Sequence, residues 1–273
     1  MQRLSQLTSP ALAGVVKEKS AEAAIAEIKR CTESGAAMID LHLPCLLQND
    51  EATLREIISA SSLPVLALHY NVTYDGESVG HGEEERVDLL LRAVRAGAAG
   101  IDMQGYTFHR PSKKGFCGED IYSFTKGDPK EIVTDGAVIA AQCDLIDRVH
   151  AMGAEVLLSC HPDIPMNATQ VVELALFLEQ RRPDIIKIVT RAESEGDMLE
   201  SVKAMLLLRR EVRTPVAYHA AGAAGRLTRI LNPVLGGQIA FCVDHHNEAS
   251  VKEQPELRVV KSIVDGIKKC CEE

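Results

Sequence analysis

The chain has 273 residues, of which 46% are hydrophobic and 25% are charged, a composition typical of a globular protein with a sizeable buried core. Its formal net charge of −9 argues against nucleic-acid and anionic-membrane partners, because both require basic patches. The charge does not exclude a small anionic substrate, which needs only one or two local arginines.

Short apolar runs alternate with longer amphipathic runs along the whole chain. In the first amphipathic run, Ala24, Ile28 and Cys31 share one helical face, and Gly35 ends the helix. Taken in chain order, the pattern predicts strands at 12–16, 38–43, 64–70, 99–104, 155–160, 185–189, 215–220 and 238–243. The helices predicted after them lie near 20–34, 50–60, 83–96, 132–152, 168–182, 193–210, 226–232 and 255–270.

The repeated strand–helix unit indicates the fold class. Parallel strands buried on both faces read as continuous apolar runs, and the predicted strands do so. A repeat of this length favours a single (β/α)8 TIM barrel over residues 1–273 rather than an open doubly wound sheet. No GxGxxG or GxxxxGK[ST] follows a strand, which argues against a nucleotide-binding fold. Residues 105–131 form a long insertion on the catalytic face, either a lid or partner surface or a solvated loop.

In a barrel the carboxyl ends of the strands form the active site, so polar residues there are candidate site residues. The predicted strand ends carry Asp40, His42, His69, Tyr70, Asp102, Gln104, Ser159, His161, Lys187, His219, His245 and His246.

Lys187 interrupts an otherwise aliphatic strand. Lysine is rarely buried without a purpose, and burial disfavours the charged form of its amine. The neutral amine is the form that attacks a carbonyl, so the position is suited to a Schiff base. The alternative is structural: a lysine paired with a buried carboxylate, or one that reaches out at the strand end.

His161 ends the neighbouring strand, where it can act as a general acid and base beside Lys187. The alternative is a hydrogen-bonded core histidine. After the seventh strand, Arg226 and Arg229 lie at a loop-to-helix junction, where an arginine can bind a carboxylate with two parallel hydrogen bonds. The residue pattern alone does not choose between these two arginines, and a solvated helix face is the structural alternative.

Several ordered motifs make the chain, from about residue 10 to residue 265, similar to type I 3-dehydroquinate dehydratase, a family of class I aldolase-type barrels. The family's SxHDF resembles residues 159–163 (SCHPD), and its lysine strand resembles 186–189 (IKIV). Its MGxxGxxSR resembles 221–229 (AGAAGRLTR), and its FGSxxTF resembles 235–241 (LGGQIAF). The family's first helix and second strand resemble 19–44.

The resemblance implies a hydro-lyase that dehydrates 3-dehydroquinate, or a closely related carboxylated cyclic β-hydroxy ketone, in shikimate-pathway or quinate metabolism. It places the imine-forming lysine at Lys187, the acid/base histidine at His161 and the carboxylate-binding arginine at Arg229. It implies no metal and no organic cofactor, because the covalent imine on Lys187 carries the reaction.

The substrate-hydroxyl shell departs from the family pattern. The family's E-x-R on the second strand becomes Asp40 and His42. The arginine of the third strand becomes Tyr70, with His69 beside it, and neither offers a guanidinium. We expect these residues to bind the substrate in place of the family's residues.

The last loop holds the family's remaining serine and glutamine. Their expected counterparts are Ser250 and Gln254, with Lys252 as the rival of Gln254. Both positions are predicted to contact the substrate.

Two other functions fit parts of the pattern. A metal-dependent barrel hydrolase or lyase would use the strand-end histidines, although the first strand carries no HxH. A diverged family member acting only as a binding or regulatory protein would explain the altered shell, but it would need neither Lys187 nor His161.

Location and assembly follow from general features. No apolar run reaches the roughly 18 residues of a membrane span, and the amino terminus lacks the apolar core of a signal peptide. The eight cysteines contain no CxxC pair, as expected for free thiols in a reducing cytoplasm. Barrels of this type are often dimers, so a homodimer is expected by analogy.

Overall fold

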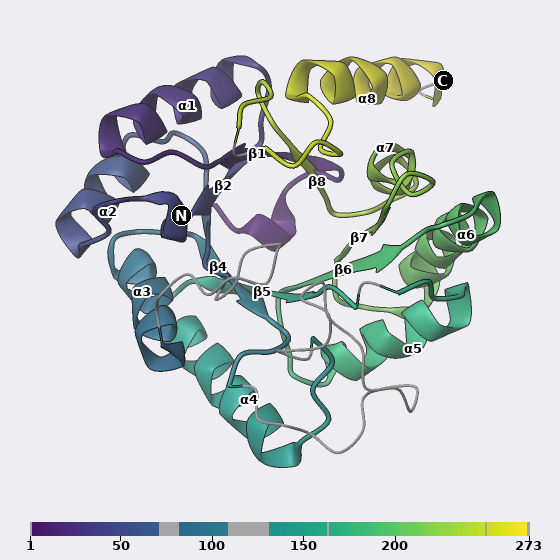
Figure 1. The fold of residues 1–273 in the computed structure, drawn as a ribbon, viewed down its shortest axis with the longest axis horizontal. Helices are drawn as coiled ribbons and strands as arrows, with labels where there is room; N and C mark the ends of the chain where they lie inside the picture. The colour runs from purple at the N-terminus through teal and green to yellow at the C-terminus, as the bar shows by residue number, and fades with distance from the viewer. Residues whose placement is uncertain (1, 71–81, 109–130, 163, 249, 272–273) are drawn as a thin grey trace.

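Eight parallel strands and eight helices alternate along the computed structural model, which describes residues 2–70, 82–108, 131–162, 164–248 and 250–271 (Figure 1). The strands are β1 (Ala11–Val16), β2 (Met38–His42), β3 (Val65–Leu68), β4 (Gly100–Gln104), β5 (Glu155–Cys160), β6 (Ile185–Arg191), β7 (Val216–Ala221) and β8 (Ile239–Cys242). The helices are α1 (Ala21–Glu33), α2 (Glu51–Ser59), α3 (Glu83–Arg95), α4 (Gly136–Ala151), α5 (Ala168–Glu179), α6 (Glu195–Glu211), α7 (Thr228–Val234) and α8 (Leu257–Cys271).

The strands form one sheet in the order β7-β6-β5-β4-β3-β2-β1-β8. Between the two end strands, the backbone N–H of Gln238 donates to the carbonyl oxygen of Val216 at 2.8 Å, which brings the sheet close to closure. The helices surround the strands (Figure 1). The predicted (β/α)8 barrel is therefore confirmed.

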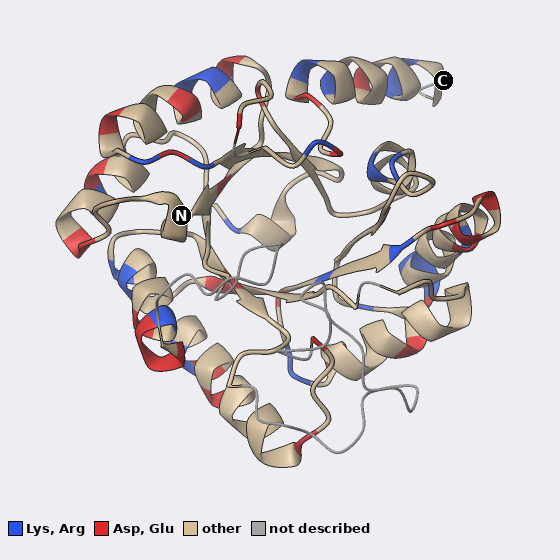
Figure 2. Ribbon diagram, viewed as in Figure 1, with Lys and Arg blue, Asp and Glu red and all other residues tan. Residues whose placement is uncertain are grey.

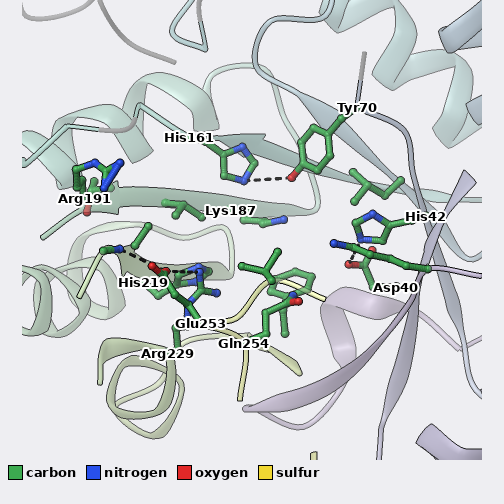
Figure 3. A pocket seen from close by; sticks show the side chains of 18 residues that line it. Asp40, His42, Tyr70, His161, Lys187, Arg191, His219, Arg229, Glu253 and Gln254 are labelled. Carbon is green, nitrogen blue, oxygen red and sulfur yellow. Dashed lines mark hydrogen bonds and ion pairs between the residues drawn. The ribbon is translucent and has the colours of Figure 1, made fainter. Parts of the chain in front are cut away.

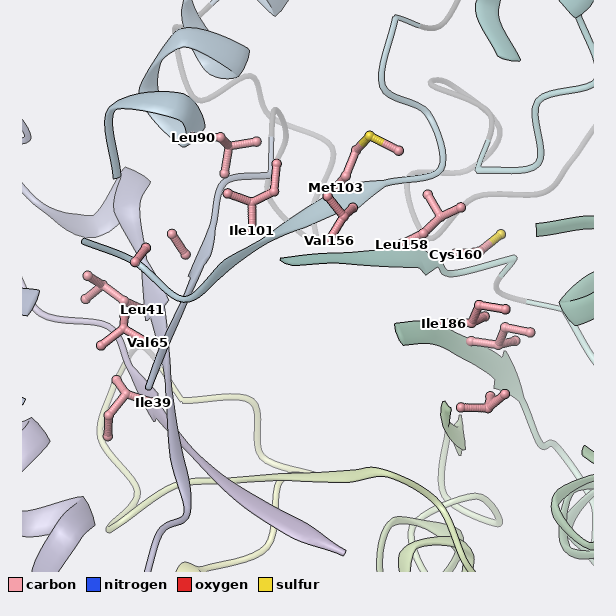
Figure 4. Packing of buried hydrophobic residues seen from close by; sticks show 14 of the residues in the cluster. Ile39, Leu41, Val65, Leu90, Ile101, Met103, Val156, Leu158, Cys160 and Ile186 are labelled. Carbon is pink, nitrogen blue, oxygen red and sulfur yellow. The ribbon is translucent and has the colours of Figure 1, made fainter. Parts of the chain in front are cut away.

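Side-chain alternation along the strands separates two apolar layers. Ile39 and Leu41 of β2 and Ile186 of β6 belong to the large cluster that packs between strands and helices (Figure 4). Ile185 and Leu157 belong to a smaller cluster inside the barrel. Residues of the same parity as Ile185, Lys187 among them, therefore point to the barrel interior.

The helices begin where the sequence supplies capping side chains. The carboxylates of Asp50 and Asp135 accept backbone N–H bonds at the starts of α2 and α4, and Asn167 and Ser194 form capping boxes at α5 and α6. Most charged residues lie on these outer helices (Figure 2). The helices thus present polar faces to solvent and apolar faces to the sheet.

The observed elements differ from the predicted ones mainly at their ends. The third strand ends at Leu68, two residues earlier than predicted. Helix α4 begins at Gly136 rather than at 132, because the buried Ile132 and Val133 pack ahead of the Asp135 cap. Most of the predicted insertion, residues 109–130, lies outside the described residues. Within the described ranges no helix is long and apolar enough to cross a membrane.

Candidate active site

A cavity of about 340 Å³ opens at the carboxyl ends of the strands (Figure 3). It is the size of a pocket for a small molecule. Polar side chains from both halves of the barrel line it. Those predicted from sequence as catalytic or substrate-binding are Lys187, His161, Arg229, Asp40, His42, Tyr70 and Gln254, and the strand-end candidate His219 lines it as well.

Lys187 lies at the centre of this cavity, between Ser159 of β5 and Ala217 of β7 in the sheet register. Its side chain is 7% exposed, and its Nζ lies 3.3 Å from Oδ2 of the fully buried Asp102. The same Nζ lies 4.3 Å from the ring centroid of Phe241, a cation–π distance. The lysine therefore has the buried carboxylate partner of the structural alternative and also reaches the cavity.

The contact with Lys187 also affects the pKa of Asp102. Burial raises the pKa of its carboxyl group, and the positive charge of Lys187 acts in the opposite direction. Gln104 also donates to Oδ1 of Asp102 at 3.2 Å. A carboxylate held in this way can balance a positive charge on the lysine nitrogen.

His161 faces the cavity just after β5. Its Nε2 lies 3.3 Å from the hydroxyl oxygen of Tyr70, and its Nδ1 lies 3.7 Å from Oε1 of Glu131. Burial, together with the positive charges of Lys187 and Arg229, lowers the pKa of His161 well below its ordinary 6.5. The imidazole is therefore neutral near pH 7 and able to accept a proton.

Glu131 contacts both the backbone and the ring of His161. Its Oε2 accepts the backbone N–H of His161 at 3.2 Å, and its side chain is completely buried. Burial raises the pKa of the Glu131 carboxyl group well above its ordinary value. Its position beside the ring allows it to orient the imidazole.

One end of the cavity is formed by Asp40 and His42 (Figure 3), whose Oδ2 and Nε2 lie 3.4 Å apart. In the described part of the chain, Oδ1 of Asp40 is buried without a hydrogen-bond partner. Lys17, the residue after β1, lines the same cavity. Burial lowers the pKa of Lys17, and the negative charge of Asp40 partly offsets that effect.

Arg229, in the first turn of α7, forms the other end (Figure 3). Its Nη2 lies 3.4 Å from Oε2 of Glu253, and its side chain is 9% exposed. Among the described residues, neither its buried Nε nor the buried Oε1 of Gln254 has a hydrogen-bond partner. Arg226 instead is exposed and donates to the carbonyl oxygen of Lys252, so the structure favours Arg229 and Gln254 over their sequence rivals.

Two of the residues predicted to bind the substrate, His69 and Ser250, do not reach the cavity. His69 is completely buried, and its Nδ1 bonds to the carbonyl oxygen of Tyr70 at 2.8 Å. It lies beyond the end of β3, where strict alternation no longer sets side-chain direction. Ser250 bonds to Oδ1 of Asn247 at 2.9 Å, within its own loop, and lines a separate small cavity.

Among the described residues, the strand-end histidines do not gather into one set of metal ligands, and of these histidines His245 alone belongs to a group spaced to hold an ion. Within the described ranges, the group of side chains spaced to hold an ion is Glu27, Asp244 and His245, none of which lines the central cavity. His42, His161 and His219 line that cavity at the ends of separate strands. Burial lowers the pKa of His219 well below 6.5, as it does for His161.

Four charged residues of the site do not stand out in the sequence. Lys17 directly follows a predicted strand, so the strand-end rule could have found it. Arg191 shares the parity of Lys187 on β6, but it lies beyond the predicted end of that strand. Glu131 and Glu253 lie in loops, where no periodic pattern announces their contact with His161 and Arg229.

Comparisons with known proteins show which family the chain resembles. Residues 138–269 match the family model described as type I 3-dehydroquinase. A 3-dehydroquinate dehydratase of Methanosarcina acetivorans is 26% identical, with 94% of this chain and 95% of the relative covered. A second, of Aromatoleum aromaticum, is 22% identical over 77% of this chain and 70% of the relative.

Solved structures support the fold. A 3-dehydroquinate dehydratase of Geobacillus kaustophilus superposes with a TM-score of 0.76 at 16% identity, covering 98% of this chain and 96% of that one. A type I enzyme of Clostridium difficile, with covalently modified comenic acid, gives a TM-score of 0.75 at 15% identity, covering 96% and 94%. The resemblance found in the sequence is thus confirmed: the chain is similar to the type I 3-dehydroquinases.

Proposed function

We propose that the chain is a Schiff-base-forming hydro-lyase that converts 3-dehydroquinate, or a closely related carboxylated cyclic β-hydroxy ketone, into the dehydrated enone. The observation that carries the proposal is the convergence of Lys187 and His161 on one cavity. The relatives of this chain that are named 3-dehydroquinate dehydratase are, by that name, lyases. A binding or regulatory protein would need neither of the two residues.

The reaction follows from the two groups. The amine of Lys187 attacks the ring ketone after passing one proton to His161, and the return of that proton expels the carbinolamine hydroxyl as water and leaves a protonated imine. Neutral His161 removes a proton from the adjacent carbon, and the protonated imine accepts the electron pair. The β-hydroxyl leaves as water after receiving a proton from the imidazolium. Hydrolysis of the imine then releases the enone and restores the amine.

Asp102 supports the charged stages of this sequence. Its Oδ2 lies 3.3 Å from Nζ of Lys187, so its negative charge stabilises the protonated imine in a buried setting. All of these steps use side chains of the chain, and the proposal requires neither a metal nor an organic cofactor.

Buried polar atoms that lack hydrogen-bond partners among the described residues indicate which ligand groups the cavity can bind. In the described structure, Asp40 offers a free acceptor, Arg229 a free donor and Gln254 a free acceptor. Leaving such groups unsatisfied costs about 1–3 kcal/mol each, so a good ligand satisfies them. A hydroxyl at Asp40, a carboxylate at Arg229 and a ketone between them, at Lys187, match a carboxylated polyhydroxy cyclic ketone (Figure 3).

A turnover assay tests the proposal. The enone product absorbs in the ultraviolet, so its formation from 3-dehydroquinate can be followed directly. We expect turnover by the purified protein, no turnover by Lys187→Met, and normal turnover by Lys203→Met, whose lysine is 62% exposed on an outer helix. Equal turnover by the Lys187→Met variant and the unchanged protein would refute the imine mechanism.

A further inference from the structure

A carboxylate of the chain itself occupies the arginine end of the cavity. Oε2 of Glu253 lies 3.4 Å from Nη2 of Arg229. The same oxygen accepts the backbone N–H of Gly222 at 3.3 Å. All three residues line the cavity, so Glu253 fills a cradle of two donors, one charged and one from the backbone (Figure 3).

The backbone donor of this cradle is fixed by the turn after β7. Gly222 has a φ of 88°, in the left-handed region that favours glycine. A Cβ at this position would lie 2.8 Å from the carbonyl oxygen of Ala192, so the turn admits no side chain. The N–H is therefore held in place whether or not Glu253 is bound to it.

The contact between Glu253 and Arg229 lacks the features of a fixed structural pair. A carboxylate that positions an arginine usually takes two guanidinium nitrogens in parallel. Here one oxygen meets one nitrogen at a long distance, and Nε of Arg229 has no partner within the described residues. The side chain of Glu253 is 29% exposed, so water can hydrate its carboxylate when it turns away from Arg229, and the loss of this partly exposed contact costs little.

We propose that Glu253 is an internal competitor for the substrate carboxylate. In the empty site its carboxylate occupies the donors of Arg229 and Gly222, and an incoming carboxylate displaces it. This inference rests on the proposed function, because it assumes that the ligand carries a carboxylate. It makes Glu253 a specificity-determining residue: a carboxylate replaces the lost contact, whereas a neutral ester does not.

Calorimetric binding of quinate, a cyclic hydroxy-carboxylate without a ketone, tests the inference without any imine chemistry. We expect Glu253→Gln to bind quinate about fivefold more tightly, because the variant removes a partly exposed ionic contact worth about 1 kcal/mol. Binding of the methyl ester should not tighten. Glu256→Gln is the matched control, since Glu256 is exposed in the same segment and does not line the cavity.

Unchanged or weaker quinate binding by Glu253→Gln would overturn the inference and indicate that Glu253 only positions Arg229. Equal tightening for the acid and the ester, or no quinate binding by either protein, would overturn it as well. If Glu253→Gln binds quinate more tightly but the unchanged protein does not turn over 3-dehydroquinate, the proposed function fails and the inference stands. A lower KM for 3-dehydroquinate with a similar kcat in Glu253→Gln would support both.

Discussion

We expect a strong energetic coupling between Lys187 and Asp102, whose side chains form a buried ion pair. At 3.3 Å, two opposite unit charges attract by about 5 kcal/mol at an effective dielectric constant of about 20. Asp102→Asn removes one charge and leaves an ammonium group buried without its counterion. Because the asparagine amide still accepts a hydrogen bond, we expect the free energy of unfolding to fall by about 2–4 kcal/mol.

A double-mutant cycle isolates this term. Lys187→Met in the Asp102→Asn background removes the unpaired charge, so the double variant should be more stable than Asp102→Asn alone, with a coupling of about 2 kcal/mol. The chain has no tryptophan, so urea unfolding is best followed by far-ultraviolet circular dichroism. Additive losses, with a coupling below about 0.5 kcal/mol, would show that the two groups do not interact as a buried ion pair.

Three further predictions concern catalysis. His161→Gln should lower kcat for 3-dehydroquinate by about 10²–10⁴-fold, since it removes the general base, and a loss below tenfold would assign the proton transfer to another group. Lys17→Met should raise KM by about tenfold with little change in kcat, because Lys17 lines the cavity beside Asp40 and its amine can donate to a substrate oxygen there; a collapse of kcat with constant KM would contradict that role. Since burial lowers the pKa of His161 well below 6.5, this base protonates only as the pH falls below that value, and the acidic limb of kcat/KM should lie below pH 6.5. A limb at or above 6.5 would contradict the burial of the ring.

The barrel could be predicted because its pattern is repeated and local. Each strand reads as an apolar run and each helix as an amphipathic one, so errors at single ends did not change the topology. The same alternation indicated that Lys187 would point inward, since it shares the parity of Ile185. Its neighbour His161 follows β5 with the parity of Leu157 and Ser159.

Positions beyond the regular elements were harder to predict. His69 and Tyr70 are adjacent after the end of β3, and only Tyr70 reaches the cavity. Loop geometry also decides that Gln254 lines the cavity and Ser250 does not. The contact between Glu131 and His161 joins residues 30 positions apart, and no local periodicity encodes such a distance.

The central claim is that Lys187 forms an imine with the substrate. Sodium borohydride added to the protein with 3-dehydroquinate should reduce the imine to a stable amine, and peptide mass spectrometry should find the added mass on the peptide containing Lys187. Lys187→Met should show no adduct under the same conditions. An adduct on another lysine, or turnover without any trapped adduct, would contradict the account.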